Sequence, residues 1–100
     1  MLFMIIHRHT AEMCPGGNVK VDRDWLRKIK SSFRNSDIKF LDGYSNAPDH
    51  EFFFLVESNN AVALTEAVDP LRKVGSVKII PVLRFEELEN WAAGAEIFYG

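Results

Sequence analysis

The order in which extended and helical patterns follow one another most constrains the fold of this 100-residue chain. Runs rich in branched and aromatic residues predict strands, whereas apolar residues three and four positions apart predict helices. The predicted strands cover residues 2–9, 38–45, 51–58 and 76–85, and the predicted helices cover residues 21–35, 60–72 and 86–94. Because no repeat or linker interrupts this order, we expect residues 1–100 to form a single domain that ends in a short helix and a tail.

The sequence strand, helix, strand, strand, helix, strand is typical of the ferredoxin-like βαββαβ arrangement, an α+β fold. Right-handed crossovers give a four-stranded antiparallel sheet of order 4-1-3-2 with the helices on one face. Pro81 has no backbone N–H, which places the last strand at a sheet edge or at a bulge. The first and third strands become antiparallel neighbours, so we expect His7, His9 and His50 to gather at one end of the sheet.

Alternation along the strands separates the two faces of this sheet. On the first strand, one set is Leu2, Met4, Ile6 and Arg8, and the other is Phe3, Ile5, His7 and His9. On the third strand, Phe52, Phe54 and Val56 form a purely apolar set, and Phe53, Leu55 and Glu57 form the other. We expect the apolar face to carry the helices, which predicts that His7 and His9 lie on the face without helices.

Three segments carry a resemblance to a known group: MLFMIIHRHTAEMCPGG, LDGYSNAPDHEFFFLVES and VKIIPVLRFEELENW. They resemble small uncharacterised proteins, with a domain of unknown function, of the dimeric α/β-barrel superfamily. The turn after that group's first strand is matched here by His9, Thr10, Glu12, Cys14 and Pro15. The resemblance implies that two copies pair as a dimeric α/β barrel. It implies no activity, because the superfamily includes cofactor-free monooxygenases, haem-degrading enzymes, stress-response proteins and ligand-sensing domains.

His7 and His9 lie on one side of a strand, with Cα atoms about 6.5 to 7 Å apart, near enough to share a metal ion. A third ligand can come from Glu12, Cys14 or His50, and this set suits zinc, copper or iron. The alternative is a pair of partly buried histidines that bond to backbone or carboxylate groups at a strand end. The sequence leaves both open.

Cys14 is the only cysteine, so the fold cannot depend on an internal disulfide. A nearby histidine would favour its thiolate and make it a nucleophile or a redox-sensitive group. Alternatively, Cys14 is a small buried hydrophobic residue. The CPGGN loop lacks the lysine of a phosphate-binding loop, which excludes nucleotide binding there.

Catalysis without a metal is a further possibility, with His7 or His9 as acid or base. The polar partners for such a ligand-binding site are Asp42, Tyr44 and Arg84. The first functional hypothesis is a homodimer that binds a small ligand or metal near His7, His9 and Cys14, with oxidoreductase-like or monooxygenase-like chemistry. The second is a noncatalytic ligand-sensing or regulatory module, so whether the protein is an enzyme stays open.

The charge of the chain indicates which kinds of partner it can bind. A net charge of -2 and a pI near 5.9 give no broad positive field, which argues against nucleic acid. The basic residues Lys20, Arg23, Arg27, Lys30 and Arg34 fall on one side of the first helix, as expected of a solvated face. The first apolar run is too short to span a membrane, and we expect a soluble cytoplasmic protein.

The expected partner is a second copy of this chain. In the predicted arrangement, Phe3, Ile5, Phe53 and Leu55 leave apolar side chains on the face without helices. A soluble monomer rarely exposes such a patch, so we expect two sheets to pack face to face. The C-terminal residues 97–99 are expected to extend this contact along the edge of the neighbour.

Overall fold

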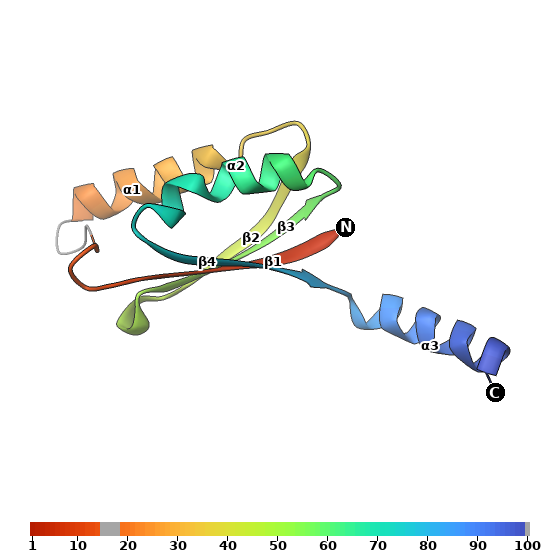
Figure 1. Cartoon of the computed structure of the whole chain (residues 1–100). Coiled ribbons are helices and arrows are strands. Elements are labelled where there is room, and N and C mark those ends of the chain that lie inside the picture. The colour runs from red at the N-terminus through yellow and green to blue at the C-terminus, as the bar shows by residue number, and fades with distance from the viewer. Residues whose placement is uncertain (15–18, 100) are drawn as a thin grey trace.

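The computed structural model describes residues 1–14 and 19–99, and it has the predicted order of elements (Figure 1). The strands are β1 (Leu2–His9), β2 (Ile38–Asn46), β3 (Glu51–Ser58) and β4 (Gly75–Val82). The helices are α1 (Val19–Ser32), α2 (Ala61–Arg72) and α3 (Phe85–Tyr99), with a single 3₁₀ turn, η1 (Ala47–Asp49), between β2 and β3. The predicted turn at Pro15, Gly16 and Gly17 lies outside the described residues.

The four strands form one antiparallel sheet of order β2-β3-β1-β4, which is the predicted order counted from the other edge. Helices α1 and α2 lie side by side over one face of the sheet, and the other face carries neither of them (Figure 1). The ferredoxin-like α+β fold is therefore confirmed. Pro81 lies on β4, which is an edge strand as predicted.

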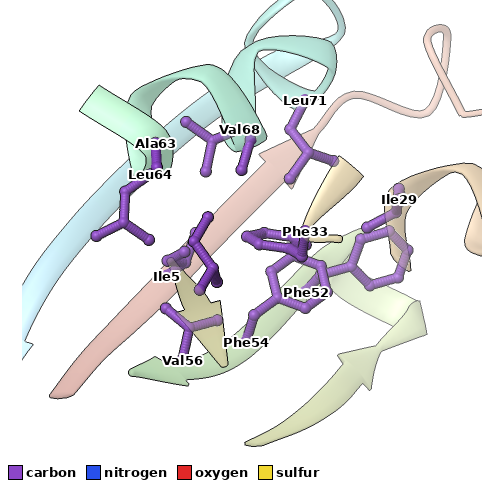
Figure 2. Packing of buried hydrophobic residues seen from close by; sticks show 12 residues of the cluster. Ile5, Ile29, Phe33, Phe52, Phe54, Val56, Ala63, Leu64, Val68 and Leu71 are labelled. Carbon is purple, nitrogen blue, oxygen red and sulfur yellow. The ribbon is translucent and has the colours of Figure 1, made fainter. Parts of the chain in front are cut away.

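The hydrophobic core lies between the sheet and the two helices (Figure 2). Its strand residues include Ile5, Phe52, Phe54 and Val56, and its helix residues include Ile29, Phe33, Leu64, Val68 and Leu71. Ile5 and Val56 are completely buried. Burial of this apolar surface is the main stabilising contribution to a domain of this size.

The two faces of β1 are the reverse of those predicted. Ile5 pairs directly with Phe54, and His7 pairs with Phe52, so the histidines share the helix-covered face with the core. The prediction that Phe3, Ile5, His7 and His9 lie on the open face was therefore wrong. A neutral imidazole can be buried when its N–H is hydrogen-bonded, whereas a guanidinium is always charged and costs more to bury, so Arg8 marks the solvent side of the strand.

The close approach of β4 to the end of β1 depends on a glycine. Gly75 pairs with His9, and a Cβ atom at Gly75 would overlap the backbone carbonyl of Arg8. Only glycine leaves room for this contact. The start of β4 therefore lies against the histidine end of β1.

Helix α3 projects away from the rest of the molecule (Figure 1). This projection gives the chain a long dimension of 57 Å, against 30 and 19 Å in the other two directions. The sequence predicted a short helix followed by a tail, but α3 continues through Gly94 to Tyr99. Gly94 costs a helix about 1 kcal/mol relative to alanine, and the neighbouring Ala92 and Ala93 favour the helical conformation. Within the described residues, no helix is both long and apolar enough to cross a membrane.

Candidate functional site

The three histidines gather at one end of the sheet, as predicted. His9 is the last residue of β1, and His50 directly precedes β3. The backbone N–H of His9 donates to the carbonyl of His50 over 3.1 Å, and the centroids of their rings are 5.2 Å apart. His50 has a φ of 52°, an uncommon left-handed conformation that ends the η1 turn and directs the chain into β3.

A chain of hydrogen bonds fixes the tautomers of His7 and His9. His7 Nδ1 lies 3.0 Å from the carbonyl oxygen of Ser76, which can only accept, so His7 Nδ1 carries the proton. Burial lowers the pKa of His7, opposed by the hydrogen bond to Ser76 and aided by the neighbouring His9, so this ring is neutral near pH 7 and its Nε2 is an acceptor. His9 Nδ1 lies 3.2 Å from that Nε2 and therefore donates to it.

The remaining ring nitrogen of His9 has no partner. Burial lowers the pKa of His9, with a further contribution from the charge of His50, so this ring is also neutral and its Nε2 has a free lone pair. Only 5% of the His9 surface is exposed, and among the described residues no group hydrogen-bonds to Nε2. A buried acceptor without a partner is costly, typically about 1–3 kcal/mol, so its retention needs an explanation.

His9 belongs to a compact group of metal-ligating side chains. One ligand atom from each of His9, Cys14 and His50 lies within 4.8 Å of the other two. Cys14 reaches this position because residues 10–13 form a turn directly after β1, with Met13 N–H donating to the Thr10 carbonyl over 3.1 Å. The Cys14 thiol is half-buried and forms no disulfide.

These side chains border a cavity of about 320 Å³ at the end of the sheet. The edge of Trp25 meets His9 with ring centroids 5.0 Å apart, and Phe52 lies 5.6 Å from the same ring. The cavity is lined by His9, Cys14, Trp25, Leu26, Ser45, Ala47, His50 and Phe52. Two histidines, the thiol and Ser45 thus supply the polar side chains of a cavity with otherwise aromatic and aliphatic walls.

The other residues that the sequence singled out lie elsewhere. Glu12 is exposed and outside the group of ligand atoms, and His7 lies behind His9 as its hydrogen-bond partner. Tyr44 Oη donates to Asp42 Oδ2 over 2.6 Å, which lowers the pKa of Asp42 and raises that of Tyr44. Arg84 pairs with Glu87 at 3.3 Å where α3 begins. Asp42, Tyr44 and Arg84 do not line the cavity beside His9.

Sequence reasoning did not single out Trp25 and Phe52 as walls of this cavity. A signal for both was present. Trp25 belongs to the apolar stripe of the first helix, one turn before Ile29, and Phe52 lies opposite His7 once β1 and β3 are paired. Trp25 and Phe52 line the cavity because His7 and His9 lie on the helix-covered face, which is the reverse of the predicted face.

Fold and site together define a small ferredoxin-like α+β domain with a partly buried histidine and cysteine cluster at one end of its sheet. The chain belongs to the family described as Domain of unknown function (DUF3303), whose model matches residues 1–96. This confirms the predicted resemblance to a group with a domain of unknown function.

Two solved structures align with most of this chain. SCO4226 from Streptomyces coelicolor A3(2) is 13% identical, with 84% of this chain and 100% of that chain covered and a TM-score of 0.54. An antibiotic biosynthesis monooxygenase is 14% identical over 84% of this chain and 100% of that chain, with a TM-score of 0.49. No curated protein matches the sequence. At 13% identity the likeness to SCO4226 describes the fold alone, and function has to be argued from the site.

Proposed function

We propose that this protein binds a transition metal ion through His9 Nε2, the Cys14 thiolate and a ring nitrogen of His50. The observation that carries the proposal is the buried lone pair of His9 Nε2, which has no hydrogen-bond partner among the described residues, on a residue grouped with two other potential ligands, Cys14 and His50. A metal ion accepts that lone pair and removes the cost of burying it. Two imidazoles and a thiolate suit zinc, copper or iron.

The His7 ring supports this role for His9. Ligating histidines commonly donate their other ring N–H to a second group, which fixes the tautomer and orients the ring. Here His9 Nδ1 donates to His7, and His7 in turn donates to the carbonyl of Ser76. Ligands of one tetrahedral ion lie roughly 3.3–3.7 Å apart, so binding requires the three ligand atoms, now within 4.8 Å, to move closer by about an ångström.

Three protein ligands leave a fourth position on a tetrahedral ion for a small molecule. The cavity of about 320 Å³ beside His9 is the place for it, and its Trp25, Leu26 and Phe52 walls favour an apolar or aromatic compound. With a redox-active metal, such a site supports oxidoreductase-like or monooxygenase-like chemistry. The second candidate is noncatalytic sensing of the same ligand. It is favoured because the cavity walls hold few polar groups, besides the proposed metal ligands, that could act as acid or base.

Metal binding is tested with chelator-treated protein titrated with Zn²⁺, and with Co²⁺ to detect thiolate ligation by its absorption. We expect one ion per chain. His9→Gln and Cys14→Ser should each weaken binding more than His7→Gln, for which about a 10–100-fold loss is expected because His7 acts through His9. His50→Asn should also weaken it, and asparagine tolerates the left-handed backbone at this position.

The matched control is Glu12→Gln, which removes an exposed carboxylate two residues from Cys14 and should leave the affinity unchanged. Binding that survives in the His9 and Cys14 variants, or that is lost equally in the Glu12 variant, would contradict the proposed ligand set. Turnover of a small apolar substrate by the metal-loaded protein would favour an enzyme. Ligand-dependent stabilisation without turnover would favour a sensor.

The proposal includes a homodimer formed through the open face of the sheet. Met4, Ile6, Phe53 and Leu55 alternate with the core residues and point to the face that α1 and α2 do not cover, and Ile80 of β4 is 38% exposed there. A standard interface buries about 800 Å² per copy, which a sheet face can supply. A reducing compartment such as the cytoplasm, which keeps Cys14 a free thiol, is the proposed location.

The dimer is tested by light scattering of the wild type and of Phe53→Asp. We expect the wild type to be a dimer at about 100 μM and the variant to dissociate, because a buried charge without a partner opposes association. Thr65→Asp adds the same charge to the exposed side of α2 and should stay dimeric. A monomeric wild type would refute this part of the proposal.

A further inference from the structure

Helix α3 carries an apolar stripe that is largely exposed in the described part of the chain. Phe85, Leu88 and Trp91 are spaced three residues apart, which places them on one side of the helix. Their exposed fractions are 83%, 46% and 68%, and the helix projects away from the sheet and from α1 and α2 (Figure 1). An amphipathic helix in this position needs a surface to cover its stripe.

A groove on the opposite side of the molecule matches this stripe. It lies between α1 and the edge strand β2, has a volume of about 370 Å³, and has Phe40 and Phe54 among its walls. Leu26 and Tyr44 border it and remain 46% and 55% exposed. Its size and walls suit an aromatic side chain such as the indole of Trp91.

Charge favours the same pairing. Helix α3 contains four glutamates and neither lysine nor arginine, whereas α1 contains five basic and two acidic residues. Lys30 of α1 and Asp42 of β2 both line the groove and offset each other there, so the attraction comes from the excess of basic residues on α1 as a whole. An acidic helix docked beside α1 is therefore attracted to it, most strongly at low ionic strength.

Symmetry places the two surfaces together. When two sheets face each other, a two-fold axis parallel to the strands sets the β4 edge of one copy over the β2 edge of the other. An axis perpendicular to the strands would instead set the two β4 edges together and the two β2 edges together. Only the axis parallel to the strands therefore brings α3 of one copy near the β2 edge of the other.

We propose that α3 is an exchanged arm, which packs its Phe85, Leu88 and Trp91 stripe into the groove between α1 and β2 of a second copy. This inference rests on the proposed homodimer. Leu26 and Phe52 line both this groove and the cavity beside His9, so the arm of one copy lies next to the metal site of the other. The dimer then contributes to the walls of the site as well as to stability.

Crosslinking between two different variants tests the arm. One protein carries Trp91→Cys and the other Leu26→Cys, each in a Cys14→Ser background so that no other thiol is present. We expect mild oxidation of the mixture to give a disulfide-linked dimer within minutes. Asn90→Cys replaces Trp91→Cys in the control, because Asn90 lies on the opposite side of α3 from the stripe, and it should crosslink at least 10-fold more slowly.

Light scattering of the same mixtures distinguishes failure of the exchanged arm from failure of the sheet-to-sheet dimer. A dimer without crosslinking above the Asn90 control would overturn the exchanged arm and leave the sheet-to-sheet dimer intact. A monomer would overturn both. Fast crosslinking that a Phe53→Asp substitution in both proteins abolishes would support the arm as part of the proposed dimer.

Discussion

The two faces of the sheet differ in what their polar residues do. On the helix-covered face, β1 ends in His7 and His9, which are buried and hydrogen-bonded to each other and to Ser76. On the open face the same strand end carries Arg8, exposed and 3.8 Å from Glu51. A buried polar group in a folded domain has to be satisfied, so the one nitrogen of His9 without a partner is a better indicator of function than any exposed charge nearby.

The largest expected difference between the faces is in stability. Ile5→Ala removes a completely buried side chain and should lower the free energy of unfolding by about 2–5 kcal/mol. Ile6→Ala makes the same chemical change on the open face. Urea unfolding at several protein concentrations should find the Ile5 effect at every concentration, and the Ile6 effect mainly where the dimer is populated. Equal losses at the lowest concentration would contradict the assignment of faces.

A smaller change in the free energy of unfolding is expected when the pH is lowered. Burial lowers the pKa of both His7 and His9 below the ordinary value of 6.5, so below that pH the unfolded chain binds more protons than the folded one. Stability contributed by the neutral rings is fully present above about pH 6.5 and is lost as the pH falls through the lowered values of the folded state.

Urea unfolding of metal-free protein between about pH 7.5 and 5.5 measures this loss. The double variant His7→Gln, His9→Gln should lose less stability over the same range, because it lacks the two groups. Identical slopes for the wild type and the double variant would show that these histidines do not account for the pH dependence.

The smallest effect is expected at the exposed ion pair. Arg8→Ala removes a contact with Glu51 in which the arginine side chain is 62% exposed, and exposed pairs are typically worth about 0–1 kcal/mol. Thermal unfolding should therefore shift by no more than a few degrees. A loss as large as that of Ile5→Ala would mean that the open face is not the solvent face of the monomer.

The sequence predicted the strands, their order and the gathering of the histidines, because periodicity and crossover handedness determine these features locally. It failed on the face of β1, where Arg8 and His7 are both polar but differ in how readily they can be buried. The tautomers of His7 and His9 were beyond reach, because they depend on the carbonyl of Ser76, which is 69 residues from His7 in the sequence. The length of α3 was missed because Gly94 suggested an end to a helix that the neighbouring alanines sustain.

The candidate ligands were all named from the sequence, but the sequence could not choose among them. His7, His9, Glu12, Cys14 and His50 all lie within reach of the predicted sheet end, and the choice depends on side-chain direction. The turn after β1 brings Cys14 back to His9 and leaves Glu12 exposed. The left-handed backbone of His50 is likewise a local conformation that periodicity does not encode.

The proposed metal site depends on the hydrogen bonds of His7 to His9 and to Ser76, which leave His9 Nε2 unprotonated and free to bind a metal ion. Long-range ¹H–¹⁵N correlation spectra of the histidine rings, recorded before and after one equivalent of Zn²⁺, test it directly. We expect both rings to carry their proton on Nδ1 in the metal-free protein and the His9 Nε2 resonance to shift most on addition of the ion. A proton on His9 Nε2 in the metal-free protein, or an unchanged His9 Nε2 resonance with Zn²⁺ present, would contradict it.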